Sequence, residues 1–485
     1  MPCNWRKART VSFQKQEQER KNMMSNKETV KTRIGELTFE SGFPSKDTVK
    51  KLYDELDFQR AVQCYIWGLP IVAFAEWQRT HTEVFGATNI DIVIYQSHFD
   101  KIGILTANTT TPYVLAFHNL AETGPIVFEL PPGPTAGIYD DFWQRPFIEM
   151  GLAGPDRGSG GKYLFLGPDQ SVDDTEGYYV AQSPTLNVGG GYRILERDPE
   201  KAKAIVQNTR IYPYSQRENP PMLRFLRPDG KRWSQAQPRG MAYWELLAQI
   251  LNKEVVEERD RFMMAMLKPL GIEKGKPFEP DNRQTKILEE AAFIGEAMAK
   301  ANSFDKRFKD ARYRPETQWD YVIMLDPLQN TEFYAQLDER AAYCYEAVTT
   351  SKAMVSKTPG IGQAYLGAYS DGEGDRLDGG QTYRLTVPPK APMKQFWSIT
   401  IYDNDTRCVI DNEQQQADLS SVMDIVTNAD DSVDLYFGPT APKGYEQNWI
   451  QTLPGRGWFA YFRLYAPLEP YFERTWPLPD IEKVK

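Results

Sequence analysis

The sequence carries one set of landmarks twice, in the same order, and this repetition restricts the fold more than any other feature. The set consists of a double proline, an aromatic strand, a Gly-Pro pair and a glycine before two aromatic residues. Its members lie at 131–132, 138–143, 167–168 and 177–179 in the first copy and at 388–389, 396–403, 438–439 and 457–459 in the second. Such a repetition indicates two related β modules. A small-molecule site is expected at their interface, because ligand clefts often form between domains.

The periodicity of apolar residues predicts the fold class. Residues 113–117 and 383–387 alternate in the way that strands with one buried face do. Between these regions, residues 241–270 carry an apolar stripe at helical spacing. The predicted fold class is therefore α+β, with two β-sandwich, jelly-roll-like modules joined by a helical insert.

The same patterns divide the chain into five predicted segments. They are a disordered tail (1–45), N-terminal helices (46–84), the first β-sandwich module (85–195), a helical insert with a linker (196–377) and the second β-sandwich module (378–485). Pro70 is expected to kink or end the first helix, because proline removes a helical hydrogen bond. Residues 360–380 are rich in glycine and aspartate, which favours a linker or functional loop.

The composition argues against several classes of protein. The 485 residues carry a net charge of −9, whereas nucleic-acid binding needs a basic face. No apolar run approaches the roughly 18 residues that span a bilayer. The four cysteines lie far apart, so neither a disulfide framework nor a cysteine zinc site is expected. The segment from Met1 lacks the apolar core of a signal peptide, which predicts a cytoplasmic protein, and Met23 and Met24 are alternative starts.

Five segments resemble a known family. They are Asn-Thr-Thr-Thr-Pro-Tyr at 108–113, Gly-Pro-Ile-Val-Phe-Glu-Leu-Pro-Pro at 124–132, Phe-Trp-Ser-Ile-Thr-Ile-Tyr at 396–402, Asn-Ala-Asp-Asp-Ser-Val-Asp at 428–434 and Arg-Leu-Tyr-Ala-Pro at 463–467. They are similar to the bacterial two-module family built from domain of unknown function 1254 followed by domain of unknown function 1214. The resemblance extends over most of the chain. It implies two β-sandwich modules with helices between them, and it implies no activity.

The resemblance has one local departure. Members of the family usually carry an acidic residue within the segment that corresponds to 108–113, and this chain has none there. If that acid holds a ligand or a metal in other members, this chain has lost it. Family members are also often exported, which differs from the location predicted here.

The three histidines, His81, His98 and His118, lie within one short part of the chain. Imidazole and carboxylate ligands together suit zinc, iron or manganese. A divalent transition metal held by His98 and His118, with an aspartate such as Asp141, is therefore one hypothesis, although no cofactor is evident from a motif and the spacing matches no metal signature. The alternatives are histidines that are hydrogen-bonded at a strand edge or the surface, and a histidine that acts as general acid or base.

Further candidates lie at the ends of two aromatic strands. The predicted catalytic residues are His118, Asp141 and Arg145 from the first module and Asp403 and Arg407 from the second. Paired carboxylates beside aromatic residues are typical of glycoside chemistry. The alternative for the second group is an ordinary turn, because Asp-Asn-Asp-Thr is common turn composition. The predicted ligand-binding residues are the aromatic side chains Tyr113, Trp143, Trp397 and Tyr402.

These observations leave three hypotheses for the function. The first is an enzyme that acts on a small organic or sugar-like molecule between the modules, by hydrolase- or lyase-type acid–base chemistry with or without a metal. The second is a non-catalytic protein that binds a carbohydrate or another small ligand on an aromatic platform. The third is a structural protein that forms a homo-oligomer through an exposed apolar patch.

Overall fold

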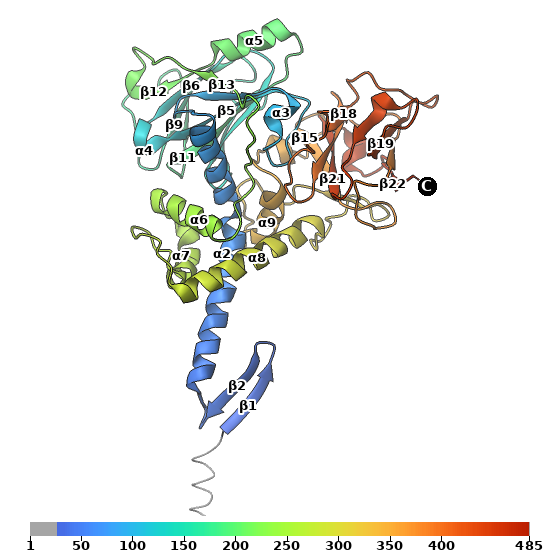
Figure 1. Cartoon of the computed structure of the whole chain (residues 1–485). Coiled ribbons are helices and arrows are strands. Elements are labelled where there is room, and N and C mark those ends of the chain that lie inside the picture. Colours follow the sequence, from blue (N-terminus) through green and yellow to red (C-terminus); the bar gives the residue numbers. More distant parts are fainter. Residues whose placement is uncertain (1–26, 485) are drawn as a thin grey trace, which may run out of the picture.

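The computed structural model describes residues 27–484 and shows the predicted mixed α+β protein (Figure 1). Apart from an N-terminal hairpin, the strands form two sheets in each half of the chain. No barrel closes among the described residues. No helix in this part of the chain is both long and apolar enough to cross a membrane. The cytoplasmic location stays a prediction.

The first half holds a six-stranded and a four-stranded sheet. In sheet order the six strands are β13 (Phe225–Leu226), β4 (Ile92–Tyr95), β5 (Tyr113–Asn119), β11 (Asn187–Ile194), β7 (Thr135–Asp141) and β8 (Pro146–Gly151), and the four are β10 (Tyr178–Gln182), β9 (Gly161–Leu166), β6 (Ile126–Leu130) and β12 (Arg210–Pro213). The helices of this half are α3 (His98–Lys101), α4 (Leu120–Thr123) and α5 (Pro199–Asn208). Phe128 and Phe165 of the smaller sheet pack against Tyr139 of the larger sheet, so the two sheets share a core.

The second half holds a five-stranded and a four-stranded sheet. In sheet order the five strands are β14 (Trp319–Tyr321), β15 (Gln363–Ala368), β21 (Trp458–Tyr465), β17 (Trp397–Asp403) and β18 (Asp418–Ser420), and the four are β20 (Trp449–Gln451), β19 (Val433–Gly438), β16 (Tyr383–Val387) and β22 (Glu482–Lys483). The short helix α10 (Glu469–Phe472) lies near the end of the chain. Phe437 of the smaller sheet packs on Trp458 of the larger sheet.

The two halves repeat one strand order. The series β10-β9-β6-β12 corresponds to β20-β19-β16-β22, and the series β4-β5-β11-β7-β8 corresponds to β14-β15-β21-β17-β18. Within these series, the β9–β10 pair and the β19–β20 pair are parallel, and every other neighbouring pair is antiparallel. The strand order thus gives every strand of the second half a counterpart in the first, and β13 of the first half has none.

The fourth landmark of the predicted repeat was matched wrongly. The glycine before Tyr178 opens β10, whose counterpart is β20, whereas the glycine before Trp458 opens β21, whose counterpart is β11. A glycine followed by two aromatic residues is a short pattern that recurs at different strands, and sheet order decides between them. The true counterpart of β21 is therefore the glycine-rich strand 187–194.

Two predicted boundaries also differ from the structure. Helix α5 and strand β12 complete the four-stranded sheet of the first half, so residue 195 ends that half too early. Strands β14 and β15 belong to the five-stranded sheet of the second half, so residue 378 begins it too late. The predicted linker 360–380 thus contains a central strand. Its small residues gave no clear alternation, because a strand between two neighbours is buried on both faces.

The central helix is α2 (Lys46–Arg79), and Ser45 caps it by accepting a hydrogen bond from the Thr48 amide. Pro70 does not end this helix, because the surrounding residues are buried on all sides and packing outweighs the lost hydrogen bond. The predicted kink stays a prediction. A π-helical turn (Thr80–Val84) follows. The helices α6 (Met241–Lys253), α7 (Arg261–Leu267), α8 (Asn282–Phe304) and α9 (Leu337–Glu346) pack around α2 (Figure 1). Short 3₁₀ turns lie at 214–216, 258–260, 268–270, 353–355 and 446–448.

An N-terminal hairpin lies at the far end of α2 from the two β halves (Figure 1). It consists of β1 (Lys27–Thr32), β2 (Gly35–Glu40) and β3 (Phe43–Pro44). These strands fall within the predicted disordered tail, which is therefore wrong for this part. Thr29 and Val30 in β1 and Thr38 and Phe39 in β2 are residue types that favour strands. The rest of the predicted tail lies outside the described residues.

Candidate ligand-binding site between the two modules

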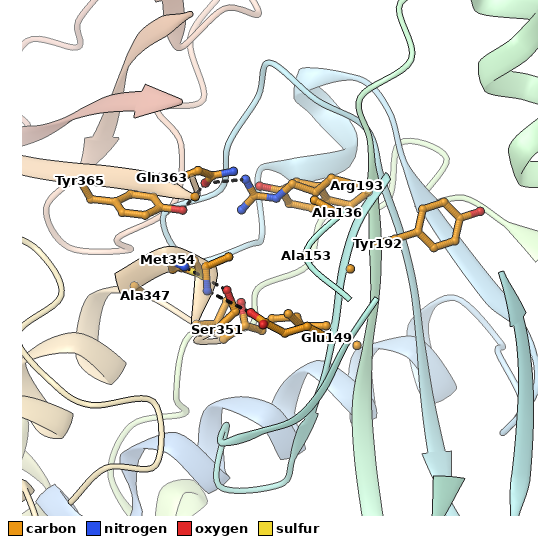
Figure 2. A pocket seen from close by; sticks show the side chains of 18 of the residues that line it. Ala136, Glu149, Ala153, Tyr192, Arg193, Ala347, Ser351, Met354, Gln363 and Tyr365 are labelled. Carbon is orange, nitrogen blue, oxygen red and sulfur yellow. Dashed lines mark hydrogen bonds between the residues drawn. The ribbon is translucent and has the colours of Figure 1, made fainter. Parts of the chain in front are cut away.

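A cavity of about 430 Å³ lies between the two β halves. One wall comes from strands β5, β7 and β11, the opposite wall comes from β15 and β21, and the segment after α9 closes a third side (Figure 2). The deep end is apolar and is formed by Phe74, Trp77, Leu105 and Phe117. Leu152 and Ile361 at the rim are about half exposed. The cavity therefore leads from the surface to a buried apolar end.

Part of the first-half wall, on β11 and β7, carries small residues in place of large side chains. Gly191 has a φ of 150°, and a Cβ atom at this position would lie 1.9 Å from the carbonyl oxygen of Val114. A side chain is therefore excluded unless β5 moves away. Ala136 and Ile138 of β7 lie beside it and also line the cavity. The open space exists because the glycine-rich strand β11 lets backbone form the wall.

Two arginine–tyrosine pairs face this cavity from equivalent positions. On β11 and β5, Arg193 lies opposite Tyr113, and its guanidinium lies 5.1 Å from the centre of that ring. On the corresponding strands β21 and β15, Arg463 lies opposite Tyr365, at 5.6 Å. All four residues line the cavity. The duplication thus places one arginine and one tyrosine on each wall.

The two arginines are held differently. Nη1 of Arg193 donates to Oε1 of Gln363 at 3.2 Å, across the cavity (Figure 2). Arg463 is buried, and its two Nη atoms donate to Oγ1 of Thr400 at 3.0 Å, to the carbonyl oxygen of Thr106 at 3.0 Å and to the hydroxyl of Tyr402 at 2.7 Å. Its Nε is buried without a partner among the described residues.

No carboxylate compensates these two charges. Within residues 27–484, the ionisable groups that most affect each arginine are tyrosines, and for Arg193 also the guanidinium of Arg463. Arginine stays protonated in proteins. The cavity therefore contains two like charges close together, and no carboxylate of the described residues forms an ion pair with either of them. The one carboxylate in the described lining, Glu149, accepts from the Ala353 amide.

The segment 108–113, which carries the family resemblance, positions tyrosines of this site. The Asn108 amide donates to the hydroxyl oxygen of Tyr113 at 2.7 Å, and its side-chain amide donates to the hydroxyl of Tyr465. Its Oδ1 accepts from the Thr111 amide at 3.1 Å, which fixes the side chain. Tyr365 donates to Gln363. One asparagine thus joins a tyrosine of each half.

A buried polar cluster lies behind the second-half wall. Tyr461 lines the cavity, and its hydroxyl has no partner within hydrogen-bond distance among the described residues. Glu346 and Lys306 are fully buried nearby, with Nζ 3.7 Å from Oε1. Tyr369 joins them, because its hydroxyl accepts from Lys306 at 2.9 Å and donates to Glu346 at 2.7 Å. Burial raises the pKa of Glu346 and lowers the pKa of Lys306, although each charge partly offsets the effect on the other.

His118 lies outside the cavity, within the core between the two sheets of the first half. Its Nδ1 lies 2.6 Å from the carbonyl oxygen of Asn89, and its Nε2 lies 2.8 Å from the hydroxyl of Tyr139. Burial lowers its pKa to about 4, partly offset by the bond to Asn89. His118 and Asp141 flank Val188 on opposite sides, two strand spacings or about 10 Å apart. The structure therefore does not bring them into hydrogen-bond contact.

Asp141 and Arg145 form a buried ion pair at the end of β7, away from the cavity lining. Nε of Arg145 donates to Oδ2 of Asp141 at 2.6 Å, and its Nη2 donates to Glu257 at 2.6 Å. Oδ1 of Asp141 accepts from the backbone amides of Trp143 and Arg145 at 2.8 and 3.0 Å. This carboxylate therefore closes the turn that follows the strand.

Asp403 has the same place in the second half. Its Oδ1 accepts from the amides of Asp405 and Thr406 at 3.0 and 2.9 Å, and its Oδ2 accepts from Nε of Arg456. Although burial opposes the shift, these bonds lower its pKa. Arg407 turns to the carbonyl oxygen of Tyr345 at 3.1 Å. Neither residue lines the cavity.

Among the four predicted ligand-binding residues, Tyr113 lines the cavity and the other three lie elsewhere. Trp143 packs on Trp67, with ring centres 4.6 Å apart. Trp397 stacks on Phe462 in the core of the second half. Tyr402 supports the site from behind, because it accepts a hydrogen bond from Arg463 and donates to the carbonyl oxygen of Ala107.

The residues proposed for a metal do not form a cluster. Both ring nitrogens of His98 are buried without a partner among the described residues, and burial lowers its pKa. His81 and His118 have separate surroundings. Between residues 27 and 484, no group of three or more histidine, cysteine, aspartate or glutamate side chains is placed to hold a metal ion.

Sequence reasoning missed the arginines and the second-half wall. Arg193 and Arg463 each interrupt an apolar strand, in Gly-Tyr-Arg-Ile and Tyr-Phe-Arg-Leu. A charge in the middle of a strand is uncommon unless it has a function, and two such strands at equivalent positions are a detectable signal. The wrong match of the fourth landmark concealed it, because it compared β10 with β21.

Comparisons with known proteins agree with this architecture. A family model described as "Protein of unknown function (DUF1254)" matches residues 92–213, and one described as "Protein of unknown function (DUF1214)" matches residues 362–469. Each matched region contains one of the two arginine–tyrosine pairs. No curated protein matches the chain.

Two solved structures are similar to this chain. The crystal structure of VPA0106 from Vibrio parahaemolyticus aligns over 88% of this chain and 100% of its own, with a TM-score of 0.55 and 18% identity. An uncharacterized protein from Burkholderia cenocepacia aligns over 90% of this chain and 97% of its own, with a TM-score of 0.41 and 12% identity. At such identities the likeness concerns the fold. With both family models matched in the predicted order, the chain belongs to the two-module family in which a DUF1254 domain precedes a DUF1214 domain.

Proposed function

We propose that this protein binds a small organic molecule in the cavity between its two β modules, each of them a jelly-roll-like sandwich that supplies one wall. The cavity itself is the observation that carries the proposal. Its volume of about 430 Å³ falls within the range of roughly 300–1,000 Å³ that is usual for small-molecule sites. Its lining combines apolar side chains with a few convergent polar groups, which is the usual composition of such sites.

The arrangement of the lining favours a ligand with an apolar body. Phe74, Trp77 and Phe117 surround the deep end, and the polar groups of Arg193 and Gln363 lie between the walls. A sugar would need many hydrogen-bonding groups along its whole length. The apolar end therefore supports the organic molecule over the sugar among the predicted ligands.

The test is a comparison of two alanine-to-phenylalanine variants. Ala347 lines the cavity and is buried, so Ala347→Phe fills part of the space. Ala121 is exposed on α4, so Ala121→Phe is the matched control. Each protein is dialysed against a mixture of small acids, amides, alcohols and sugars, and the bound compounds are measured by mass spectrometry. We expect the wild type and the control to retain at least one compound that Ala347→Phe does not retain.

Equal retention by all three proteins, or no retention by the wild type, would contradict the proposal. If Ala347→Phe does not fold, as judged by circular dichroism, Ala136→Phe fills the cavity from the opposite wall. The position of Ala136 on β7, beside Arg193, makes this second variant independent of α9.

A second candidate function is acid–base catalysis, of hydrolase or lyase type, in the same cavity. The supporting observation is Tyr461, which lines the cavity and lies near the buried carboxylate of Glu346. In this proposal Tyr461 exchanges a proton with the bound molecule, and Glu346 exchanges it with Tyr461. The five catalytic residues predicted from the sequence do not line the cavity, so Tyr461 replaces them in this role.

Tyr461→Phe separates catalysis from binding, because it removes only the hydroxyl. Compounds retained in the dialysis experiment are incubated with each protein, and new products are measured by mass spectrometry. We expect turnover by the wild type, loss of turnover by Tyr461→Phe and retention of binding by both. Turnover by the variant at the wild-type rate would exclude this role.

The predicted homo-oligomer has support from the N-terminal arm. Phe43 in the hairpin is 76% exposed and Tyr53 in α2 is 60% exposed, with Leu52 and Leu56 beside it partly exposed. We propose that this arm contacts a second copy of the chain. Sedimentation of the Phe43→Ser, Tyr53→Ser double variant is expected to show a smaller particle than the wild type. Phe293→Ser on α8, also strongly exposed, is the control, and an unchanged particle size in the double variant would contradict the proposal.

A further inference from the structure

We infer that the ligand of this cavity carries a carboxylate, and that Arg193 and Arg463 bind it from opposite walls. This inference rests on the proposed function and adds the chemical class of the ligand, an aromatic or aliphatic carboxylic acid. It is carried by two cations that face the same space, Arg463 buried and Arg193 partly exposed, and that form no ion pair with a carboxylate of the described residues.

The first step is the balance of charge. A buried charge costs several kcal/mol unless a counter-charge or hydrogen bonds compensate it. Among the other buried arginines of the described chain, Arg145 has both Asp141 and Glu257 as acidic partners. Arg340 and Arg407 lie outside the cavity and bond instead to backbone carbonyl and glutamine side-chain oxygens. Arg193 and Arg463 have none among residues 27–484, and each lies near the other. A bound anion supplies the compensation that the described chain does not.

The second step is the supply of hydrogen-bond donors. Nη1 of Arg193 donates to Gln363, and no carboxylate or backbone carbonyl of the described chain accepts from its other nitrogens. Nε of Arg463 is buried and without a partner. Tyr113 accepts from the Asn108 amide, which leaves its own proton for an acceptor in the cavity. Donors from both walls therefore remain for one anion.

The third step distinguishes a carboxylate from a phosphate. Phosphate sites usually use a helix N-terminus or consecutive free backbone amides. Around Arg193 the backbone amides belong to the ladders between β5, β11 and β7. A carboxylate accepts two parallel bonds from one guanidinium and needs no such amides. The apolar end of the cavity then receives the remainder of the acid.

The experiment compares three probes of the same shape. Naphthoate carries a carboxylate, naphthamide is its neutral counterpart, and naphthyl phosphate carries the alternative anion. Their affinities are measured by isothermal titration calorimetry for the wild type, Arg193→Met, Ala347→Phe and the control Arg210→Met. Arg210 is exposed on β12 and does not line the cavity, so its variant reproduces the change in net charge. Decanoate and decanamide repeat the comparison for an aliphatic body.

We expect the wild type and Arg210→Met to bind naphthoate at least about tenfold more tightly than naphthamide, because a charged hydrogen-bonded pair contributes about 1.5–3 kcal/mol. Arg193→Met is expected to remove this preference and to keep the affinity for the amide. Ala347→Phe is expected to weaken both probes. If Arg463→Met folds, it should also reduce the preference for the acid.

The remaining outcomes separate this inference from the proposed function. If the wild type binds the acid and the amide with equal affinity, and Ala347→Phe binds neither, the ligand is not recognised by a carboxylate. That outcome would contradict the inference but would still support small-molecule binding in the cavity. If the wild type binds naphthyl phosphate more tightly than naphthoate, and Arg193→Met loses this difference, the inference of a carboxylate ligand would be wrong and a phosphate ligand would replace it. Failure of every probe to bind the wild type would contradict the inference and the proposed function together.

Discussion

The two β halves place an aspartate and an arginine four residues apart at the same point of the same strand, yet they bond them differently. Asp141 lies opposite Val188 on β11, and Asp403 lies opposite Trp458 on β21. In the first half Arg145 bonds to Asp141, and both side chains are buried. In the second half Asp403 bonds instead to a half-exposed arginine, Arg456, and Arg407 turns to other partners.

This difference shows which of the two repeated residues stabilises the turn in both halves. In both halves the aspartate accepts two backbone amides of the turn after the strand. A carboxylate at the start of a turn stabilises that turn by local hydrogen bonds. The arginine has no such local task, so its partner differs between the halves. The aspartates predicted to be catalytic are therefore best understood as residues that close a duplicated turn.

The two walls of the cavity also carry different residues at equivalent positions. Gly191 and Tyr461 hold equivalent positions, two residues before Arg193 and Arg463. The glycine leaves space on one wall, and the tyrosine supplies a hydroxyl on the other. A ligand-binding site built from two copies of one fold thus has one open wall and one polar wall.

The largest expected effect concerns the two turns. Asp141→Asn keeps an acceptor for the turn amides and breaks the buried ion pair, which should cost about 3–5 kcal/mol. Asp403→Asn breaks a pair whose arginine is half exposed, and should cost about 1 kcal/mol because solvent screens it. Chemical denaturation of both variants measures the difference. Equal losses would show that the two turns depend on their ion pairs to the same extent.

The next largest expected effect is a loss of folding stability at low pH, to which the two halves should contribute differently. Burial lowers the pKa of His118 to about 4 from an ordinary 6.5. The unfolded chain therefore binds the proton more readily, so this contribution to stability is complete above about pH 6.5 and is lost as the pH falls towards 4. At 1.36 kcal/mol per pKa unit the loss is about 3 kcal/mol. The second half contains no histidine, so only the first half should respond in this way.

The variant His118→Gln checks this expectation. Glutamine keeps one donor and one acceptor for Asn89 and Tyr139, and it does not titrate. Thermal unfolding at pH 7 and pH 5 should show a smaller acid loss for the variant than for the wild type. Gln237→Asn, at a buried residue outside the first-half core, is the control and should keep the full acid loss. An identical acid loss in His118→Gln and the wild type would exclude His118 as its source.

The equivalent positions Gly191 and Tyr461 offer a third comparison. Gly191→Ala places a Cβ atom against the backbone of β5, and this strain should cost about 2–3 kcal/mol. Tyr461→Phe removes a hydroxyl without a partner among the described residues, and should cost less than about 1 kcal/mol. Melting temperatures of both variants measure the contrast. A neutral Gly191→Ala would mean that β5 moves easily and that the wall is not fixed.

The sequence predicts the positions of the strands better than their pairing within the sheets. Alternation identified the regions of β5 and β16, because a strand with one buried face shows its period locally. It missed β12, β14 and β15, which are short or buried on both faces. Sheet order is a non-local property, so a three-residue motif was matched to the wrong strand. Because this match pairs β21 with β10, it leaves out β11, the strand that contains Arg193.

The candidate site was predicted only at Tyr113. The histidines are close in the sequence, but they lie on a π-helical turn, on the short helix α3 and on strand β5. The residues that form the site come from strands about 80 and 100 residues apart within each half, and only the pairing of those strands places arginine beside tyrosine.

The smallest expected effect gives the sharpest contrast between the two arginines. Arg463→Met leaves Thr400, Tyr402 and the carbonyl oxygen of Thr106 without their donor, so without ligand it should cost about 2 kcal/mol. Arg193→Met removes one long hydrogen bond and also the repulsion between two like charges. Its stability without ligand should therefore stay within about 0.5 kcal/mol of the wild type. Thermal unfolding of the two variants side by side measures this.

A large loss of stability in Arg193→Met would identify Arg193 as part of the framework, like Arg463, and would remove it as the free anchor for a ligand. If Arg193→Met loses little stability but loses the preference for acids, Arg193 binds the ligand and Arg463 supports the wall. One copy of the duplicated arginine would then hold the wall together, while the other copy remains available because no carboxylate of the described residues forms an ion pair with it.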